Sequence, residues 1–210
     1  MATIVRPRVS DRTGQTAWWT AGLALVIGAN AIVASPVLAD AWDICSGSHG
    51  PEVIITCSNV IEYTKNPANR EDAYVNRGIQ YFSMGNTDLA IADYTSAIKL
   101  DPTDAIAFNN RGNALADKGE FKRAIADYSE AIRLKPQYEH AFLNRGITYL
   151  GLKDYDRAIT DFDQAIRLNP NDASAFNNRG LAKLKKGDMA SGNEDVTWAR
   201  HLQPGIGESH

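Results

Sequence analysis

The chain has 210 residues, of which 44% are hydrophobic and 22% are charged, a composition typical of folded proteins rather than disordered or collagen-like ones. Its 22 lysines and arginines against 25 aspartates and glutamates give a formal net charge of −3. This dispersed negative charge argues against a nucleic-acid partner, because nucleic acids are bound by dense cationic surfaces. The two cysteines allow one disulfide at most and are too few for a four-ligand structural zinc site.

Residues 1–39 are predicted to be a secretory signal. Arg6, Arg8 and Arg12 precede an apolar stretch over residues 17–34, and a helix-breaking Ser35-Pro36 leads to a cleavage site after Ala39. An uncleaved anchor in the inner membrane is the alternative, since the apolar stretch is close to the shortest length that spans a bilayer. In both cases we expect the rest of the chain outside the cytoplasm, in a bacterial periplasm or secreted. After cleavage we expect no contact with the membrane.

Cys45 and Cys57 are the only thiols, and both lie beyond the predicted cleavage site. Two nearby cysteines in an exported chain favour a disulfide. The alternative is a buried thiol in a helix over residues 54–63 and an unrelated, exposed thiol at Cys45.

A repeat with a period of 34 residues follows. The triplet Asn-Arg-Gly occurs at residues 76–78, 110–112, 144–146 and 178–180, and an aromatic residue, alanines and a closing proline recur with it. Apolar residues at three- and four-residue spacing predict two helices in each unit. Gly85, Gly119 and Gly187 stand between the two helices, where the chain often needs a positive φ. Lys153 takes that place in the third unit, so we expect a slightly different turn there. The glycine of each triplet predicts close helix packing against the alanines of the second helix.

This pattern resembles the tetratricopeptide repeat family over roughly residues 71–204. The resemblance implies an all-α fold, a right-handed superhelical solenoid of helix-turn-helix hairpins. The expected units are residues 71–104, 105–138, 139–172 and 173–204, followed by a tail over 205–210. Residues 54–63 align with the second helix of a unit, so 40–70 is expected to be a disulfide-capped segment with an unpaired half-repeat helix. In the fourth unit Asn193 and Arg200 replace isoleucines, as expected of a degenerate repeat that caps the array with a polar face.

One departure from the family is systematic, because arginine precedes each repeat glycine where leucine is usual. An aspartate stands sixteen residues after each arginine, which gives the pairs Arg77 and Asp93, Arg111 and Asp127, Arg145 and Asp161, and Arg179 and Asp195. The simpler interpretation is a set of partly buried structural ion pairs that link the two helices. An anion-binding groove formed by the arginines is the alternative.

Asparagine recurs on one face of every first helix, at Asn76, Asn110, Asn144 and Asn178. The resemblance implies that first helices line a concave face and that these asparagines form a ladder holding the main chain of a bound peptide. Asn109, Asn113 and Asn177 lie beside the ladder and are predicted to contact the peptide as well. The lysines with which chaperone-binding relatives hold a terminal carboxylate are missing. The neighbouring positions are mostly apolar and uncharged, so we expect weak salt dependence. The alternative is that the asparagines only bond neighbouring helices.

The sequence holds no recognisable catalytic motif, and its four histidines share no metal-ligand spacing. We therefore expect no enzyme activity, no cofactor and no metal. The leading interpretation is a non-enzymatic adaptor that binds an extended segment of a protein partner on the concave face. Two alternatives are a self-associating structural scaffold and an accessory subunit of an envelope enzyme complex.

Overall fold

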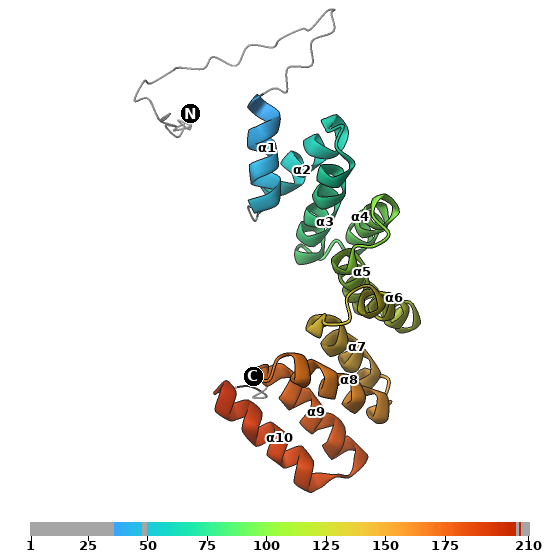
Figure 1. The fold of residues 1–210 in the computed structure, drawn as a ribbon, viewed down its shortest axis with the longest axis vertical. Coiled ribbons are helices and arrows are strands. Elements are labelled where there is room, and N and C mark those ends of the chain that lie inside the picture. The colour runs from blue at the N-terminus through green and yellow to red at the C-terminus, as the bar shows by residue number, and fades with distance from the viewer. Residues whose placement is uncertain (1–35, 48–49, 205, 207–210) are drawn as a thin grey trace, which may run out of the picture. The chain divides into compact units, whose positions relative to one another are not determined.

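The computed structural model describes residues 36–47, 50–204 and 206. Residues 1–35 of the predicted secretory signal and most of the predicted tail lie outside these ranges. The described residues form ten helices (Figure 1): α1 (Pro36–Gly47), α2 (Pro51–Tyr63), α3 (Pro67–Ser83), α4 (Thr87–Leu100), α5 (Ala105–Asp117), α6 (Phe121–Leu134), α7 (Glu139–Gly151), α8 (Tyr155–Leu168), α9 (Ala173–Lys186) and α10 (Met189–Leu202). None of these helices is both long enough and apolar enough to cross a membrane.

The helices pack in chain order, each against the next, as consecutive hairpins (Figure 1). The first helices of successive hairpins also contact one another, α3 with α5, α5 with α7 and α7 with α9. Among the described helices, the second helices α4, α6, α8 and α10 make no such contacts with each other. First helices therefore lie closer together than second helices do. This arrangement confirms the predicted all-α fold of helix hairpins.

The N-terminal hairpin differs from the expected unpaired helix. Helix α1, which begins within the predicted signal, packs against both α2 and α3. A disulfide joins Cys45 of α1 to Cys57 of α2, with their Cα atoms 4.9 Å apart, and both cysteines are buried. The predicted disulfide is confirmed, and it closes a complete helix pair at this end of the described chain.

The repeat glycines face aromatic rings rather than the alanines that the sequence analysis expected. A Cβ atom on Gly112 would lie 2.6 Å from Cε1 of Tyr128, and one on Gly146 would lie 2.7 Å from Cε1 of Phe162. The flat ring of the second helix thus lies directly on the backbone of the first. In the fourth hairpin Val196 takes the place of the ring, and a Cβ on Gly180 would meet it at 2.8 Å.

The turn inside each of the four repeat hairpins has a residue with positive φ, including the third turn, where a different conformation was expected. Lys153 has a φ of 62°, compared with 76° at Gly85 and 77° at Gly119. Its N–H donates to the carbonyl of Leu150, as the glycine N–H groups do at the equivalent places. The prediction of a different turn is wrong, because the surrounding helices hold a lysine in the left-handed region.

Candidate functional site

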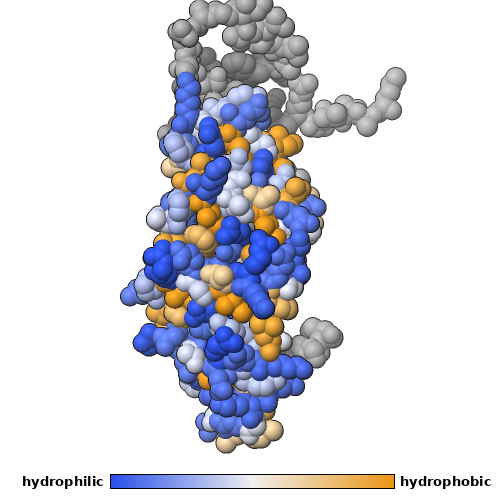
Figure 2. Space-filling model, turned by 90° about the vertical axis from the view of Figure 1, so that its right-hand side faces the viewer, coloured by the Kyte–Doolittle hydropathy of each residue, from blue (hydrophilic) through white to orange (hydrophobic). Residues whose placement is uncertain are grey.

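The exposed side of the first helices α3, α5, α7 and α9 is the candidate binding surface, and we call it the inner face. Apolar side chains repeat along it, with Ile79, Ile106, Ile147 and Leu181 each at least one third exposed. Figure 2 shows another view of the surface, on which apolar and hydrophilic residues alternate instead of gathering in one large patch. On the inner face, these four exposed apolar residues lie one on each first helix.

Most of the asparagines predicted to bind a peptide are half-buried, and several are bonded within the protein. Asn144 donates from Nδ2 to Oδ1 of Asn109 at 3.1 Å, which links α7 to α5. Asn178 donates to the carbonyl of Ser174 in its own helix at 2.9 Å, and Asn113 accepts a hydrogen bond from the hydroxyl of Tyr128 at 2.9 Å. Asn109 is only 4% exposed, so a direct contact between Asn109 and a peptide does not fit the structure.

A cavity of about 520 Å³ opens on the inner face between α3 and α5. Asn76 lines it together with the apolar side chains of Val75, Ile79 and Ile106. The remainder of its lining is Thr103 and four acids, Glu71, Asp72, Asp101 and Asp104. The expectation of a mostly uncharged lining is wrong for this cavity.

Glu71 is the most perturbed of these acids. It is 8% exposed, and its Oε1 has no hydrogen-bond partner among the described residues. Burial, followed by repulsion from Asp104 and Asp72, raises the pKa of its carboxyl to about 8. The proximity of Asp104 thus favours the protonated form of Glu71. Burial and the charge of Asp104 also raise the pKa of Asp72.

Two other acids of the cavity are held by local hydrogen bonds. Asp104 caps helix α5, accepting hydrogen bonds from the backbone N–H groups of Ile106 at 2.8 Å and Ala107 at 3.0 Å. Asp101 accepts from the backbone N–H of Thr103 at 2.8 Å and from its hydroxyl at 2.6 Å. The hydroxyl hydrogen bond lowers the pKa of Asp101. These contacts fix the two carboxylates at the rim of the cavity.

The arginine before each repeat glycine forms a bidentate ion pair with the aspartate on the next helix. The Nε and Nη2 distances are 2.8 and 2.8 Å for Arg77–Asp93, 2.7 and 2.9 Å for Arg111–Asp127, 2.8 and 2.8 Å for Arg145–Asp161, and 2.8 and 2.6 Å for Arg179–Asp195. Each pair links the two helices of one hairpin.

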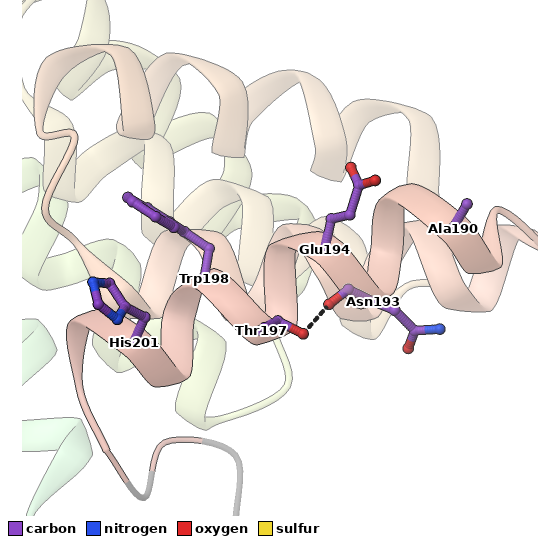
Figure 3. Close-up of a pocket in the computed structure, with 6 residues that line it drawn as sticks. All are labelled: Ala190, Asn193, Glu194, Thr197, Trp198 and His201. Carbon is purple, nitrogen blue, oxygen red and sulfur yellow. Dashed lines mark hydrogen bonds between the residues drawn. The ribbon is translucent and has the colours of Figure 1, made fainter.

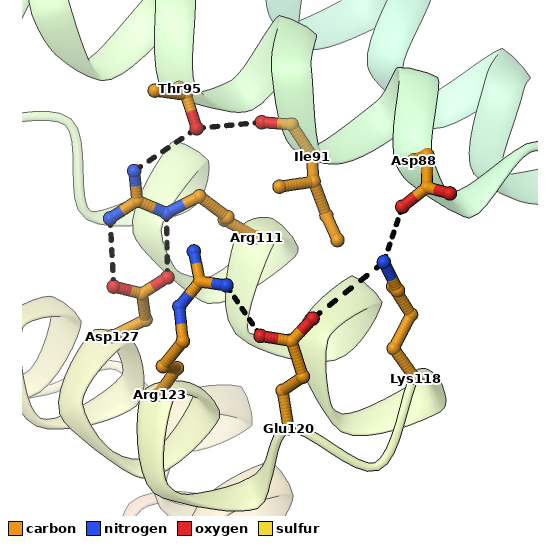
Figure 4. A network of polar contacts seen from close by, with 8 residues as sticks. All are labelled: Asp88, Ile91, Thr95, Arg111, Lys118, Glu120, Arg123 and Asp127. Atoms are coloured by element: carbon orange, nitrogen blue, oxygen red, sulfur yellow. Dashed lines mark hydrogen bonds and ion pairs between the residues drawn. The ribbon is translucent and has the colours of Figure 1, made fainter.

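The third nitrogen of each guanidinium reaches the preceding hairpin. Nη1 donates to Ser58 at 2.8 Å, Thr95 at 3.3 Å, Ser129 at 2.9 Å and Asp163 at 2.7 Å, in chain order (Figure 4 shows the second case). The guanidinium carbons also lie 5.3 to 5.9 Å from the ring centroids of the aromatic residues three positions earlier. The arginines thus connect three helices, and this geometry favours the structural interpretation over an anion-binding groove.

Family profiles match the same region. Residues 78–119 and 112–153 match the family described as TPR repeat, and residues 140–172 match the family described as Tetratricopeptide repeat. Together these matches identify residues 78–172 as tetratricopeptide repeats. No curated protein matches its sequence.

Several solved structures resemble this chain. MamA from Desulfovibrio magneticus RS-1 is 18% identical with a TM-score of 0.70, over 82% of this chain and 98% of that one, which shows a shared fold alone. PilF of Pseudomonas aeruginosa is 26% identical with a TM-score of 0.62, over 66% of this chain and 64% of that one. The first tetratricopeptide repeat domain of Spaghetti (RPAP3), bound to the HSP90 peptide SRMEEVD, is 26% identical with a TM-score of 0.55, over 56% and 93%.

The last described helix, α10, carries a second cavity, of about 510 Å³. Trp198 and His201 line one end of it, and Asn193 and Glu194 lie further along α10 (Figure 3). Trp198 is 48% exposed and Met189 is 60% exposed. The terminal face predicted to be polar therefore keeps an exposed aromatic residue.

Sequence reasoning missed the acidic contacts of the inner face. The sequence does contain a pattern that indicates them: a glutamate at the start of a unit and an aspartate 33 residues later. It occurs in the first unit, at Glu71 and Asp104, and in the third, at Glu139 and Asp172. Burial, followed by a hydrogen bond with Asp172, raises the pKa of Glu139. Because the pattern recurs in alternate units, a search for features common to all four does not find it.

Among the described residues no cluster of three or more side chains is arranged to hold a metal ion.

Proposed function

We propose that this chain is a non-enzymatic adaptor that holds an extended segment of a partner protein on its inner face. The cavity between α3 and α5 carries this proposal, because it joins Asn76 to apolar side chains on two successive first helices. Tetratricopeptide repeats generally serve protein–protein interaction, and one solved relative holds a peptide. No enzyme family matches the chain, and the matches found are to repeat domains alone.

The spacing of the first helices suits a peptide in extended conformation. Packed helices lie about 8–10 Å apart, and an extended chain rises about 3.3 Å per residue. One amide on each first helix therefore meets roughly every third residue of the peptide. An asparagine amide offers both donors and an acceptor, enough to engage a peptide carbonyl and N–H together. Asn76 and Asn110, half-buried on neighbouring helices, are the amides that we assign to this role.

The chemistry differs from that of the relative that binds SRMEEVD, an acidic peptide. The inner face offers carboxyls at Asp72 and Asp104, and the repeat arginines are occupied by Asp93 and its equivalents. An acidic peptide would meet repulsion at this end of the inner face. We therefore do not propose a ligand of that kind.

A matched pair of variants tests the role of the asparagines. A photo-crosslinker at Ile147, exposed on α7, identifies the partner segment, and its affinity is then measured by fluorescence anisotropy. Asn76→Ala with Asn110→Ala is expected to weaken binding at least tenfold, with the helical circular dichroism unchanged. Asn193→Ala, exposed on α10 away from the first helices, is the control and keeps full affinity. Unchanged affinity in the double variant would contradict the proposal.

We also propose that the chain acts outside the cytoplasm. The buried Cys45–Cys57 disulfide supports this compartment, since structural disulfides persist in oxidising environments. N-terminal sequencing of native protein tests the cleavage after Ala39, and thiol labelling under denaturing conditions tests the oxidised state. Two alkylated cysteines together with an intact Met1 would place the chain in the cytoplasm.

The exposed face of α10 supports a second candidate function, self-association as a scaffold. Trp198 lies beside the rings of Phe176 and His201, at centroid distances of 6.4 and 5.3 Å, yet is half exposed. Sedimentation velocity over a hundredfold range of concentration distinguishes this function from a monomeric adaptor. A concentration-dependent increase in mass that Trp198→Ala abolishes would favour the scaffold.

A further inference from the structure

Four carboxyl groups converge on the cavity between α3 and α5 without a cation to balance them. The buried Glu71 and the exposed Asp72 lie near the start of α3, and Asp101 and Asp104 come from the segment before α5. Within the part of the chain that the structure describes, none of the four forms an ion pair with lysine, arginine or histidine. The cavity is therefore a site of concentrated negative potential on the inner face.

Glu71 indicates that a hydrogen-bond donor belongs in this cavity. Its side chain is more than nine-tenths buried, it lines the cavity, and its Oε1 has no partner among the described residues. A buried polar atom without a partner costs free energy that a bound donor restores. No described residue supplies this donor, so water or a bound ligand does.

The rim of the cavity is prepared for a positive charge. The backbone N–H groups of Ile106 and Ala107 are both taken by Asp104, so the start of α5 has fewer free donors for an anion. Asp101 is likewise held as a carboxylate by Thr103. With these groups fixed, an incoming cation meets preorganised acceptors and little reorganisation is needed.

The walls of the cavity narrow the choice of cation. Val75, Ile79 and Ile106 are apolar, and the last two are 37% and 47% exposed. Arginine and lysine carry their charge on an apolar stem that lies along such surfaces. The described side chains do not bring three metal ligands together here, which argues for an organic cation.

We propose that this cavity binds an arginine or lysine side chain of the peptide held on the inner face. The inference rests on the proposed adaptor function and names the chemistry of the partner. The cationic head bonds Glu71 and Asp104, and its stem packs on Ile79 and Ile106. A guanidinium is the better fit of the two heads, because its planar fork of donors pairs with carboxylates in bidentate fashion.

The protonation state of Glu71 links this binding to pH. The groups that face it are Asp72 on its own helix, Asp104 at the start of α5 and Asp101 between α4 and α5. Burial and, after it, the charges of these three acids raise the pKa of Glu71 to about 8 when the cavity is empty. A bound cation stabilises the carboxylate, so binding at neutral pH releases a proton and affinity rises as the pH increases toward 8.

The third and fourth repeats contain a natural comparison. Glu139 and Asp172 repeat the pair formed by Glu71 and Asp104, but His140 and Asn169 replace Asp72 and Asp101. His140 Nδ1 lies 2.9 Å from a carboxyl oxygen of Glu139. The second pair thus has two fewer acids around it and a basic neighbour, and we expect no cation site there.

The test uses short blocked peptides and the purified full chain. The probe is acetyl-Ala-Leu-Arg-Leu-Ala-amide, with citrulline, lysine and glutamate replacing arginine in matched peptides. Unblocked Ala-Leu-Gly-Leu-Ala-amide supplies an amino terminus as the only cation. Amide shifts in ¹H–¹⁵N spectra give the affinity and locate the site. The arginine peptide is expected to bind at least tenfold tighter than the citrulline peptide, with the largest shifts near Glu71 and Ile106.

Three variants test whether this cavity binds the arginine side chain of the peptide. Glu71→Gln and the exposed Asp72→Asn each reduce arginine-peptide affinity about fivefold or more, whereas Glu139→Gln leaves it unchanged. Glu71→Gln also removes the rise in affinity between pH 6 and pH 8. Three results would overturn the inference without contradicting the adaptor function. They are equal affinities for the arginine and citrulline peptides, a higher affinity for the peptide with a free amino terminus, and a loss of affinity in Glu139→Gln equal to that in Glu71→Gln. If the wild-type protein binds none of these peptides on its inner face, the result would instead contradict the adaptor function itself.

Discussion

Arg111 donates from Nε and Nη2 to the two carboxylate oxygens of Asp127, at 2.7 and 2.9 Å, and its Nη1 donates to Thr95 at 3.3 Å (Figure 4). The guanidinium thus joins α4, α5 and α6, two helices of one repeat and one of the repeat before. Leucine fills this place in the family that the sequence resembles, and it packs without fixing an orientation. The bidentate arginine adds a directional contact between neighbouring repeats.

Removal of one partner of this pair is expected to destabilise the protein strongly. Arg111 and Asp127 have side-chain exposures of 18% and 10%, so a remaining single charge is poorly solvated. Arg111→Leu or Asp127→Ala alone is expected to cost about 2–4 kcal/mol of unfolding free energy. The double variant should cost less than the sum of the two, with a coupling of at least 1 kcal/mol. Urea unfolding of the four proteins measures this difference.

An exposed ion pair in the same repeat is the control. Arg123 pairs with Glu120 on the first turn of α6, where the arginine side chain is 63% exposed (Figure 4). A double-mutant cycle on this pair is expected to give a coupling of about 0.5 kcal/mol or less, because water screens the charges. Similar couplings for the two pairs would show that burial adds nothing to Arg111 and Asp127.

The sequence predicted the repeat architecture because every unit carries the same pattern in register. The aspartate sixteen residues after each arginine was visible for this reason. The third contact of each arginine was not, since Ser58, Thr95, Ser129 and Asp163 share only the ability to accept a hydrogen bond. Because the accepting residue differs from repeat to repeat, the sequence does not reveal that the contact is the same in all four.

The candidate site was predicted less well than the fold. Asn109 stands beside the ladder in the sequence, but the structure buries it between α5 and α7, where Asn144 bonds it. Whether an asparagine faces a ligand or a neighbouring helix depends on the angle between successive hairpins, and helix periodicity carries no information about that angle. The acidity of the first cavity likewise depends on residues brought together from α3 and the start of α5.

Gly112 is expected to be sensitive to the smallest substitution. An added Cβ would lie 2.6 and 2.8 Å from two ring atoms of Tyr128, whose side chain is itself buried. The strain of such overpacking, about 1–3 kcal/mol, exceeds the gain of about 1 kcal/mol that alanine brings to a helix. Thermal unfolding should therefore show a lower Tm for Gly112→Ala.

Gly151 provides the matched control for this prediction. It ends helix α7, and an added Cβ would meet no atom within 4 Å. Gly151→Ala is expected to raise stability by up to about 0.5–1 kcal/mol, because alanine loses less backbone entropy on folding. A loss of stability at Gly151 equal to that at Gly112 would mean that the ring contact is not the cause.

Lys153 is a position where a natural residue carries strain. Its φ of 62° lies in the left-handed region, which costs an L-residue roughly 1–2 kcal/mol relative to glycine. Lys153→Gly is expected to stabilise the protein by about 0.5–1 kcal/mol after the entropy cost of glycine is subtracted. The reverse change, Gly119→Lys at the equivalent turn with a φ of 77°, should destabilise it. Equal Tm values for all three proteins would contradict the expected strain.

Glu71 should make the stability of the empty protein fall as the pH rises. Its pKa is raised from 4.5 to about 8 by folding, so the folded state binds the proton more tightly than the unfolded chain does. Its stabilising contribution is complete below about pH 4.5 and is lost as the pH passes through 8. Glu71→Gln keeps the size of the side chain and does not ionise. Between pH 5 and pH 8, the unfolding free energy of the variant should therefore increase relative to that of the wild type by about 1–3 kcal/mol, as measured by urea unfolding.

Glu130 is the control with the opposite sign, because the hydrogen bond from Arg133 lowers its pKa on the exposed surface of α6. A lowered pKa adds stability only as the pH rises toward 4.5 and leaves it constant above that value, so Glu130→Gln should keep a constant stability difference from the wild type between pH 5 and pH 8. The two variants therefore diverge with pH, which a general effect of glutamine substitution cannot produce. A constant difference in unfolding free energy between Glu71→Gln and the wild type from pH 5 to pH 8 would contradict the prediction. It would mean that Glu71 is already ionised in the folded protein at pH 5. Addition of the arginine peptide should reduce the divergence, because the bound cation supports the Glu71 carboxylate that folding otherwise disfavours.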